Sequence, residues 1–273
     1  MTAPTTSGAA PGWVPTGRCA LVGMVHLRPL PGSPGWQGDL GAVLDAAERD
    51  ADALLDGGCD ALIVENMGDV PYLRGAVPPW TVAAMALATE RVALRGAPVG
   101  VQVLAAANRE ALGIAVAAGA KFVRVEAFAY GHVADEGWLD ACAGPLLRDR
   151  ATLGAGGVPA GVAIWADIRK KHAAHAATAD LSLADVARGT AFCGADLLVV
   201  TGTATGAPTD PAHVLAAREA GLPVAVGSGV TPDDAGALAA VAQALIVGSW
   251  LKIGGDWRAG VDVDRVRAVR RAI

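Results

Sequence analysis

The chain has 273 residues, of which 53% are hydrophobic and 18% are charged, and its formal net charge at pH 7 is −5. The apolar fraction argues against disorder, and the length fits one eight-stranded α/β barrel. Because the chain lacks a basic excess, nucleic acid and anionic membrane surfaces are excluded as expected partners, and no apolar run approaches the ~20 residues that span a bilayer.

The first 17 residues contain neither a basic residue nor an apolar segment, so they are typical of a flexible tail and not of a secretion signal. We therefore expect a cytoplasmic protein with a tail over 1–18 and one barrel domain over 19–273. The four cysteines lack the CxxC spacing of zinc sites and redox motifs, which predicts reduced thiols. The alanine-rich composition hints at a bacterial source.

Eight apolar strands are predicted in chain order, beginning with Ala20 to His26. Four begin with a small residue, and the other three begin at a proline closely preceded by glycine. The first kind covers 59–66, 120–127, 195–202 and 242–249, and the second covers 98–103, 159–167 and 223–229. The first two strands of each kind start 61 residues apart, at Cys59 and Ala120 and at Pro98 and Pro159, which is the length of two βα units. Alanine-rich amphipathic stretches such as 40–55, 82–94 and 109–117 lie between strands. This pattern predicts a single (β/α)8 TIM barrel. The alternative, an open doubly wound sheet, favours a GxGxxG turn after the first strand, and the sequence has none there.

A barrel of this kind places its active site where the strands end at their carboxyl termini. The residues at those predicted ends are unusually polar. They are His26, Glu65, Asn66, Gln102, Glu126, Asp167, Thr201, Gly227 to Gly229, Gly248 and Ser249.

The last two predicted strands end in glycine-serine pairs, as GSGVTPDD and GSWLKIGGD. Bare backbone N–H groups at these positions can bind a phosphate. We therefore predict phosphate contacts from Gly227, Ser228, Gly229, Gly248, Ser249 and Lys252. The alternatives are that the glycines only turn the chain and that Lys252 is a solvated helix residue.

Three carboxylates, Glu65, Glu126 and Asp167, end predicted strands and are expected to converge on one mouth, where crowding and burial would raise some of their pKa values toward the working pH. Each could instead cap a helix or pair with Arg124, Lys170 or Lys171. Two histidines, His26 and His172, are placed to relay a proton. Hydroxyls of Thr201, Thr203 and Thr205 suit a sugar or a phosphate. The end of the sixth strand, where a Schiff-base lysine is expected in barrel aldolases, is occupied by Thr201.

Several separated motifs resemble those of the BtpA/SgcQ family, from about Leu21 to the C-terminus. The motifs are LVGMVHLRPLPGSP, DALIVENMGDVPY, the Asp167 to His172 stretch, VVTGTATG, PVAVGSGVT and IVGSWLKIGG. The resemblance implies a barrel of the phosphate-binding type. It carries over His26, Glu65, Asn66, Asp167, Lys171, His172, Thr201, Gly202, Gly206, Gly227, Ser228, Gly229, Gly248 and Lys252. Gln102 and Glu126 depart from the family pattern, because asparagine is the common residue at both positions.

These patterns favour an isomerase, lyase or glycosidic-bond enzyme that acts on a phosphorylated sugar or nucleotide-like substrate. Glu126 and Asp167 would exchange protons and His26 or His172 would assist, while Glu65 with Asn66 would orient hydroxyls. Gln102 and Lys171 would also contact the substrate. A metal-dependent version would use the carboxylates and a histidine to hold a divalent ion. The alternative function, implied by a photosystem-linked family member, is a non-catalytic assembly or stability factor that binds a cofactor precursor or a protein. We also predict a homo-oligomer.

Overall fold

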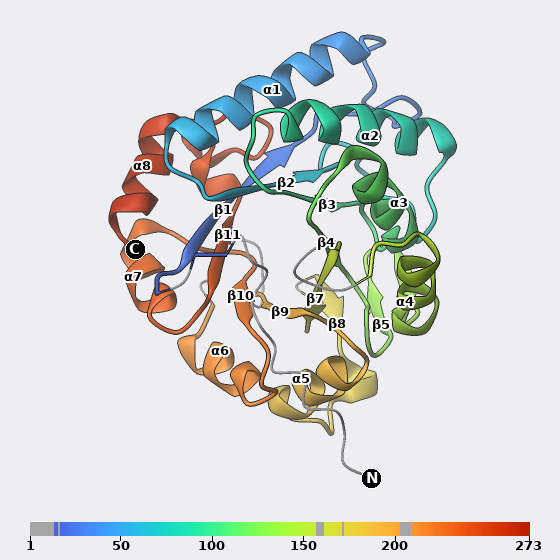
Figure 1. The fold of residues 1–273 in the computed structure, drawn as a ribbon, viewed down its shortest axis with the longest axis vertical. Coiled ribbons are helices and arrows are strands. Elements are labelled where there is room, and N and C mark those ends of the chain that lie inside the picture. Colours follow the sequence, from blue (N-terminus) through green and yellow to red (C-terminus); the bar gives the residue numbers. More distant parts are fainter. Residues whose placement is uncertain (1–13, 16, 157–160, 171, 203–208) are drawn as a thin grey trace.

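The computed structural model describes residues 14–15, 17–156, 161–170, 172–202 and 209–273. The expected tail therefore lies largely outside the described residues, and so do three predicted substrate contacts, Lys171, Thr203 and Thr205. Within the described residues, eight parallel strands close into a barrel that is surrounded by helices (Figure 1). The predicted TIM barrel is confirmed.

All eight predicted strands form the barrel wall. They are β1 (Ala20–His26), β2 (Ala61–Glu65), β3 (Val99–Gln102), β4 (Phe122–Val125), β7 (Ala163–Ile168), β9 (Leu197–Val200), β10 (Val224–Val226) and β11 (Ala244–Val247). Around the closed sheet the order is β1-β11-β10-β9-β7-β4-β3-β2. This order places β10 opposite β3 and β11 opposite β4 across the barrel.

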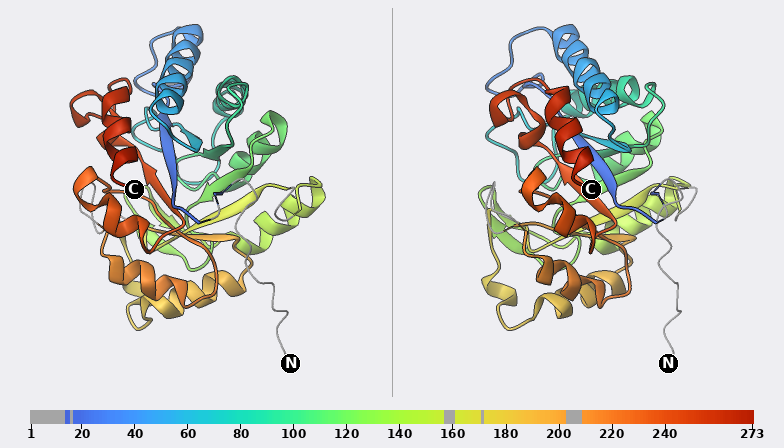
Figure 2. Two further views of the ribbon diagram at one scale, coloured as in Figure 1. Left: turned by 60° about the vertical axis from the view of Figure 1, so that its left-hand side comes forward. Right: turned by 90° about the vertical axis from the view of Figure 1, so that its left-hand side faces the viewer.

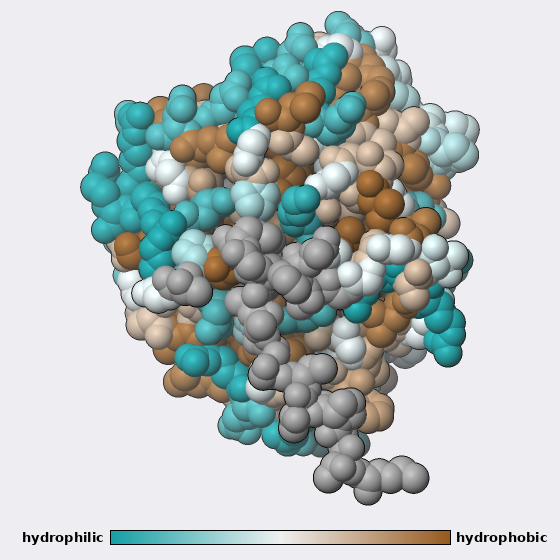
Figure 3. Space-filling view, in the orientation of Figure 1, coloured by the Kyte–Doolittle hydropathy of each residue, from teal (hydrophilic) through white to brown (hydrophobic). Residues whose placement is uncertain are grey.

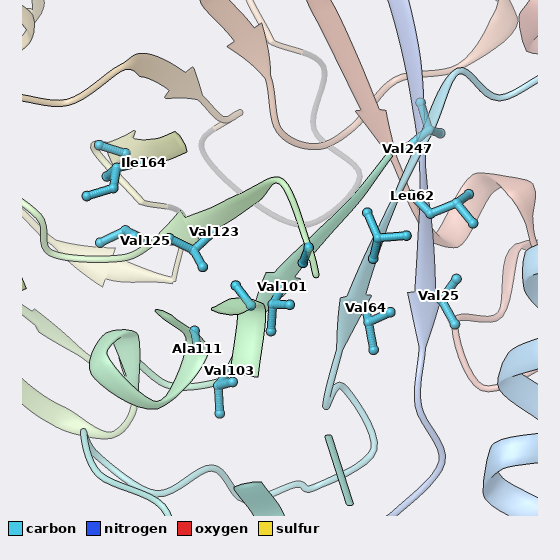
Figure 4. Packing of buried hydrophobic residues seen from close by; sticks show 14 of the residues in the cluster. Val25, Leu62, Val64, Val101, Val103, Ala111, Val123, Val125, Ile164 and Val247 are labelled. Carbon is cyan, nitrogen blue, oxygen red and sulfur yellow. The ribbon is translucent and has the colours of Figure 1, made fainter. Parts of the chain in front are cut away.

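Side chains alternate along each strand between the barrel interior and the surrounding helices, as the period of a β-strand requires. The outward residues form the larger core cluster, of which Val64, Val101 and Val123 are labelled in Figure 4. The interior is filled by a second cluster in which Phe122 and Trp165 stack with ring centroids 4.2 Å apart. Gly100 makes room for this stack, because a Cβ there would lie 2.3 Å from the Phe122 ring.

In the described part of the chain, eight α-helices flank the barrel strands, and Figure 2 shows helices on the outside of the sheet. They are α1 (Leu40–Asp56), α2 (Pro79–Ala93), α3 (Asn108–Ala118), α4 (Ala143–Thr152), α5 (Leu183–Phe192), α6 (Pro211–Arg218), α7 (Pro232–Ala239) and α8 (Val263–Arg271). Short 3-10 turns are η1 (Ala176–Thr178), η2 (Ser249–Leu251) and η3 (Ile253–Gly255). The predicted helices over 40–55, 82–94 and 109–117 are thus confirmed. Hydrophilic residues gather over the α1 and α8 edges of the molecule (Figure 3).

A second sheet, which the sequence patterns did not predict, joins two loops at the mouth of the barrel. It contains β5 (His132–Ala134), β6 (Gly137–Leu139) and β8 (Ala173–Ala174) in the order β6-β5-β8. Both pairings are antiparallel. Because β5 and β6 follow β4 while β8 follows β7, this sheet ties the loops of two different βα units together.

In the described part of the chain, no helix has both the length and the apolar character needed to span a membrane. The four cysteines are free thiols, and two of them, Cys19 and Cys59, are buried.

Candidate functional site

A cavity of about 570 Å³ lies where the barrel strands end at their carboxyl termini. Its wall contains most of the predicted site residues that the structure describes. These are His26, Glu65, Gln102, Glu126, His172, Thr201, Gly227, Ser228, Gly229, Gly248 and Ser249. The structure therefore brings this set together at one mouth, and the roles of these residues stay predictions.

Three neighbouring strands place His26, Glu65 and Gln102 side by side along one wall of the cavity. His26 pairs in register with Glu65, and Glu65 pairs in register with Gln102. His26 Nε2 lies 3.4 Å from Glu65 Oε2, and both side chains are at least 92% buried. Gln102 is 3% exposed, and its Oε1 has no hydrogen-bond partner among the described residues. A buried acceptor without a donor favours binding of a ligand that donates a hydrogen bond.

Glu126, Lys170 and Glu136 form a charged cluster beside this wall. Lys170 Nζ lies 3.2 Å from Glu126 Oε1 and 3.7 Å from Glu136 Oε2. The second oxygen of Glu126 accepts a hydrogen bond of 3.0 Å from the Ala106 N–H. Burial raises the pKa of Glu126, although the Lys170 ammonium opposes this shift. Burial lowers the pKa of Lys170, but the two carboxylates outweigh it and leave that pKa raised, so Lys170 stays protonated.

Asp167 does not line this cavity. Its carboxylate is 1% exposed and accepts two hydrogen bonds from Arg124, of 3.0 Å from Nε and 2.9 Å from Nη2. The proton-transfer role predicted for Asp167 is therefore corrected, because pairing with Arg124, the alternative reading, is what the structure shows. Arg124 also donates a hydrogen bond of 3.3 Å to the Gly227 carbonyl, which holds the loop after β10 against the barrel interior.

The opposite wall is formed by the loops after β10 and β11. Gly227 to Gly229 follow β10, and Gly248 with Ser249 follows β11. Ser228 is 9% exposed, and its Oγ has no hydrogen-bond partner among the described residues. Gly229 has a φ of +73°, which a residue with a side chain rarely adopts. Gly229 therefore does turn the chain, and its loop lines the cavity together with Gly248 and Ser249.

Two other predicted site residues are structural. Lys252 is completely buried, and its Nζ lies 2.6 Å from Asp50 Oδ2 on α1, so it does not reach the cavity. Asn66 accepts a hydrogen bond of 2.7 Å from the Leu104 N–H and donates one of 3.1 Å to Asp69. Its amide therefore orders the loops after β2 and β3 and does not orient a substrate. Both predictions are corrected on these contacts.

Lys170, Glu136 and Tyr72 also line the cavity, although they were not predicted as site residues. Lys170 follows the end of β7 by two residues in the DIRKKH stretch, so its position past a strand end was the available signal. Tyr72 ends the DALIVENMGDVPY motif, seven residues after Glu65, and Glu136 lies between β5 and β6; neither follows a barrel strand directly. Among the described residues, no group of three or more His, Cys, Asp or Glu side chains is arranged to hold a metal ion. The metal-dependent mechanism stays a prediction.

Comparison with known proteins gives the relationships of this chain. It is 42% identical over 258 residues to an uncharacterized mitochondrial protein of Caenorhabditis elegans, covering 91% of each chain. It is 39% identical over 259 residues to the photosystem I biogenesis protein BtpA of Synechocystis, covering 93% of this chain and 87% of the relative.

Among solved structures, thiamine phosphate pyrophosphorylase from Pyrococcus furiosus has the same fold, with a TM-score of 0.55 and 14% identity over 93% of this chain and 94% of that one. The family model described as the BtpA family matches residues 18–273. That match agrees with the motifs noted in the sequence. The chain therefore belongs to the BtpA family.

Proposed function

We propose that this protein is an enzyme that uses acid–base chemistry on a small phosphorylated substrate, such as a phosphorylated sugar or a nucleotide-like molecule. One observation carries the proposal: the cavity places glycine- and serine-containing loops opposite a buried set of titratable groups. A scaffold alone requires neither feature. Isomerisation, elimination and cleavage of a glycosidic bond all fit such a site.

The loops after β10 and β11 would bind the phosphate. Ser228 Oγ and the backbone N–H groups of Ser228 and Gly229 have no hydrogen-bond partners among the described residues. Phosphate oxygens are strong acceptors that such donors bind well. The solved structure of thiamine phosphate pyrophosphorylase has the same fold, and its name identifies a phosphorylated compound.

Glu126 would act as the general acid or base. Its raised pKa brings it closer to the working pH, where a proton can be both taken and returned. His26 and Glu65 form a second pair at hydrogen-bonding range on the adjacent wall, where His26 would relay a proton and Glu65 would orient it. Lys170 would stabilise negative charge that develops on the substrate, since it stays protonated.

A thermal-shift screen tests the phosphate part of the proposal. Inorganic phosphate, sugar phosphates and nucleoside monophosphates are compared on the wild type, because a ligand at 100 times its Kd stabilises a protein by ~2.7 kcal/mol. We expect Ser228→Ala to reduce the shift. The control is Thr152→Val, which removes one exposed hydroxyl at the end of α4. No shift with any phosphorylated compound would remove the basis of the proposal.

A non-catalytic role is the second candidate, and it rests on one observation. The Synechocystis relative is named for photosystem I biogenesis. In an assembly factor the carboxylates at the strand ends should tolerate substitution, so Glu126→Gln would keep function. In the enzyme the same substitution should abolish turnover of any substrate that the screen identifies, while ligand binding persists.

The expected homo-oligomer stays a prediction that light scattering can check. So does the cytoplasmic location, since the worm relative is named as mitochondrial.

A further inference from the structure

Carboxylates outnumber cations on the cavity wall. Among the described residues, Glu65, Glu126, Asp135 and Glu136 line it, whereas the lining cations are Lys170 and Arg124. Arg124 is already neutralised by its two hydrogen bonds to Asp167. Glu65 lies 3.4 Å from His26 Nε2, so the Lys170 ammonium faces three further carboxylates on this wall. Lys171 lies outside the described residues, and even adding its charge leaves carboxylates in excess.

Two buried acceptors on this wall lack donors. Glu136 Oε2 is 3.7 Å from Lys170 Nζ, which is too long for a hydrogen bond, and no other described residue donates to it. Gln102 Oε1 is also buried without a donor, on a side chain that is 3% exposed. Leaving a buried acceptor unsatisfied costs about 1–3 kcal/mol. Hydrogen-bond donors of a ligand in this cavity would satisfy these acceptors.

The carboxylates on this wall also act on the neighbouring side chain of Tyr72. Tyr72 lines the same cavity, and its pKa is raised, first by burial and then by the charges of Glu65, Glu136 and Glu126. These carboxylates would repel an anionic ligand group. A cationic ligand group would lose its hydrating water on entering the cavity and gain attraction to the carboxylates instead.

The acidic wall and the proposed phosphate loops face each other across the barrel. Gln102 ends β3, which lies opposite β10 and its glycines, and Glu126 follows β4, which lies opposite β11 and Gly248. A substrate that spans the cavity therefore meets backbone and hydroxyl donors at one end and acceptors at the other.

We infer that the substrate is zwitterionic: it carries an ammonium or similar cationic donor group at the end remote from its phosphate, and this group binds against Glu136 and Gln102. The inference rests on the proposed function for the phosphate end only. A neutral polyol could satisfy the two acceptors, but it would leave the excess negative charge uncompensated. An ammonium supplies three donors and the charge together.

Isothermal titration calorimetry with four matched probes tests the inference on the wild-type protein. The probes are glucose, glucosamine, glucose 6-phosphate and glucosamine 6-phosphate, so that the amine and the phosphate are varied independently. A second pair, phosphoethanolamine and 2-hydroxyethyl phosphate, repeats the amine comparison on a smaller molecule. We expect the amine to lower Kd by about tenfold or more in at least one phosphorylated pair, the size of one well-placed charged contact.

Glu136→Gln should remove most of this preference while leaving the affinity for the hydroxyl probe of the pair nearly unchanged. The control is Glu90→Gln, which neutralises an exposed carboxylate on α2 and should preserve the preference. Equal affinities for amine and hydroxyl probes, or no binding of any amine probe, would overturn the inference.

The four probes also separate this inference from the proposed function. If glucosamine binds better than glucose but phosphorylation adds no affinity, the phosphate site fails and the cationic site stands. If phosphorylation adds affinity and the amine does not, the phosphate site stands and the cationic site fails.

Discussion

Replacing Lys252 with methionine should destabilise the fold and spare the cavity. Lys252 is completely buried, and Asp50 accepts hydrogen bonds of 2.6 Å from its Nζ and 2.9 Å from the Val261 N–H. Lys252→Met keeps the side-chain length but leaves the Asp50 carboxylate, 14% exposed, without its cation. Breaking a buried pair by removing one partner costs about 3–5 kcal/mol. The free energy of unfolding in water should fall by that amount.

Urea denaturation followed by tryptophan fluorescence measures this loss. The double variant Lys252→Met with Asp50→Asn should recover most of the stability, because it leaves no uncompensated charge and keeps an acceptor for Val261. Ligand affinity in the phosphate screen should be unchanged in Lys252→Met. A loss below about 1 kcal/mol, or a selective loss of phosphate binding, would refute the assignment of Lys252 to the scaffold.

Three further variants test individual contacts. Because the pKa of Glu126 is raised in the folded state, the free energy of unfolding of the wild type should fall as pH rises from the ordinary Glu pKa of about 4.3 through the raised one. Over that rise Glu126→Gln should gain stability relative to the wild type in urea titrations, and a difference that does not change with pH would contradict the raised pKa. Gly248→Ala places a Cβ 2.9 Å from His26 Cε1. We therefore expect the free energy of unfolding to fall by ~1–3 kcal/mol and turnover to be impaired. Wild-type values for both quantities would show that the imidazole can move. Asp167→Asn should cost about 3–5 kcal/mol because Arg124 loses its counter-charge, and a calorimetric melting temperature equal to wild type would argue against a structural pair.

The barrel could be predicted because its strands are buried on both faces. Such strands appear in the sequence as continuous apolar runs, and the spacing of 61 residues shared by two pairs of them indicates the βα repeat. The small sheet at the mouth could not be predicted in this way. Its strands contain only two or three residues each, which is too short for any periodicity, and β8 is the pair Ala173–Ala174.

The site was predictable in position and less so in role. Strand ends give the list of candidates, but partners distant in sequence decide which of them face a ligand. Asp167 pairs with Arg124 from a different strand, and Lys252 pairs with Asp50, 202 residues earlier. No local pattern contains either contact. Lys170 shows the converse, since the sequence indicates only an ion-pair partner there, and the structure places Lys170 on the cavity wall.

The antiparallel pairing of β5 with β8 has a consequence for engineering. It joins the loop that carries Glu136 to the loop that carries Lys170 by backbone hydrogen bonds, at Val133 with Ala174 and Ala134 with Ala173. If only one of the two loops were replaced by that of a relative, the remaining strand, β5 or β8, would lose its partner. Its backbone N–H and C=O groups would then be unpaired at the mouth of the barrel. The two loops therefore form one module, and specificity at this mouth can be exchanged between family members only by moving both together.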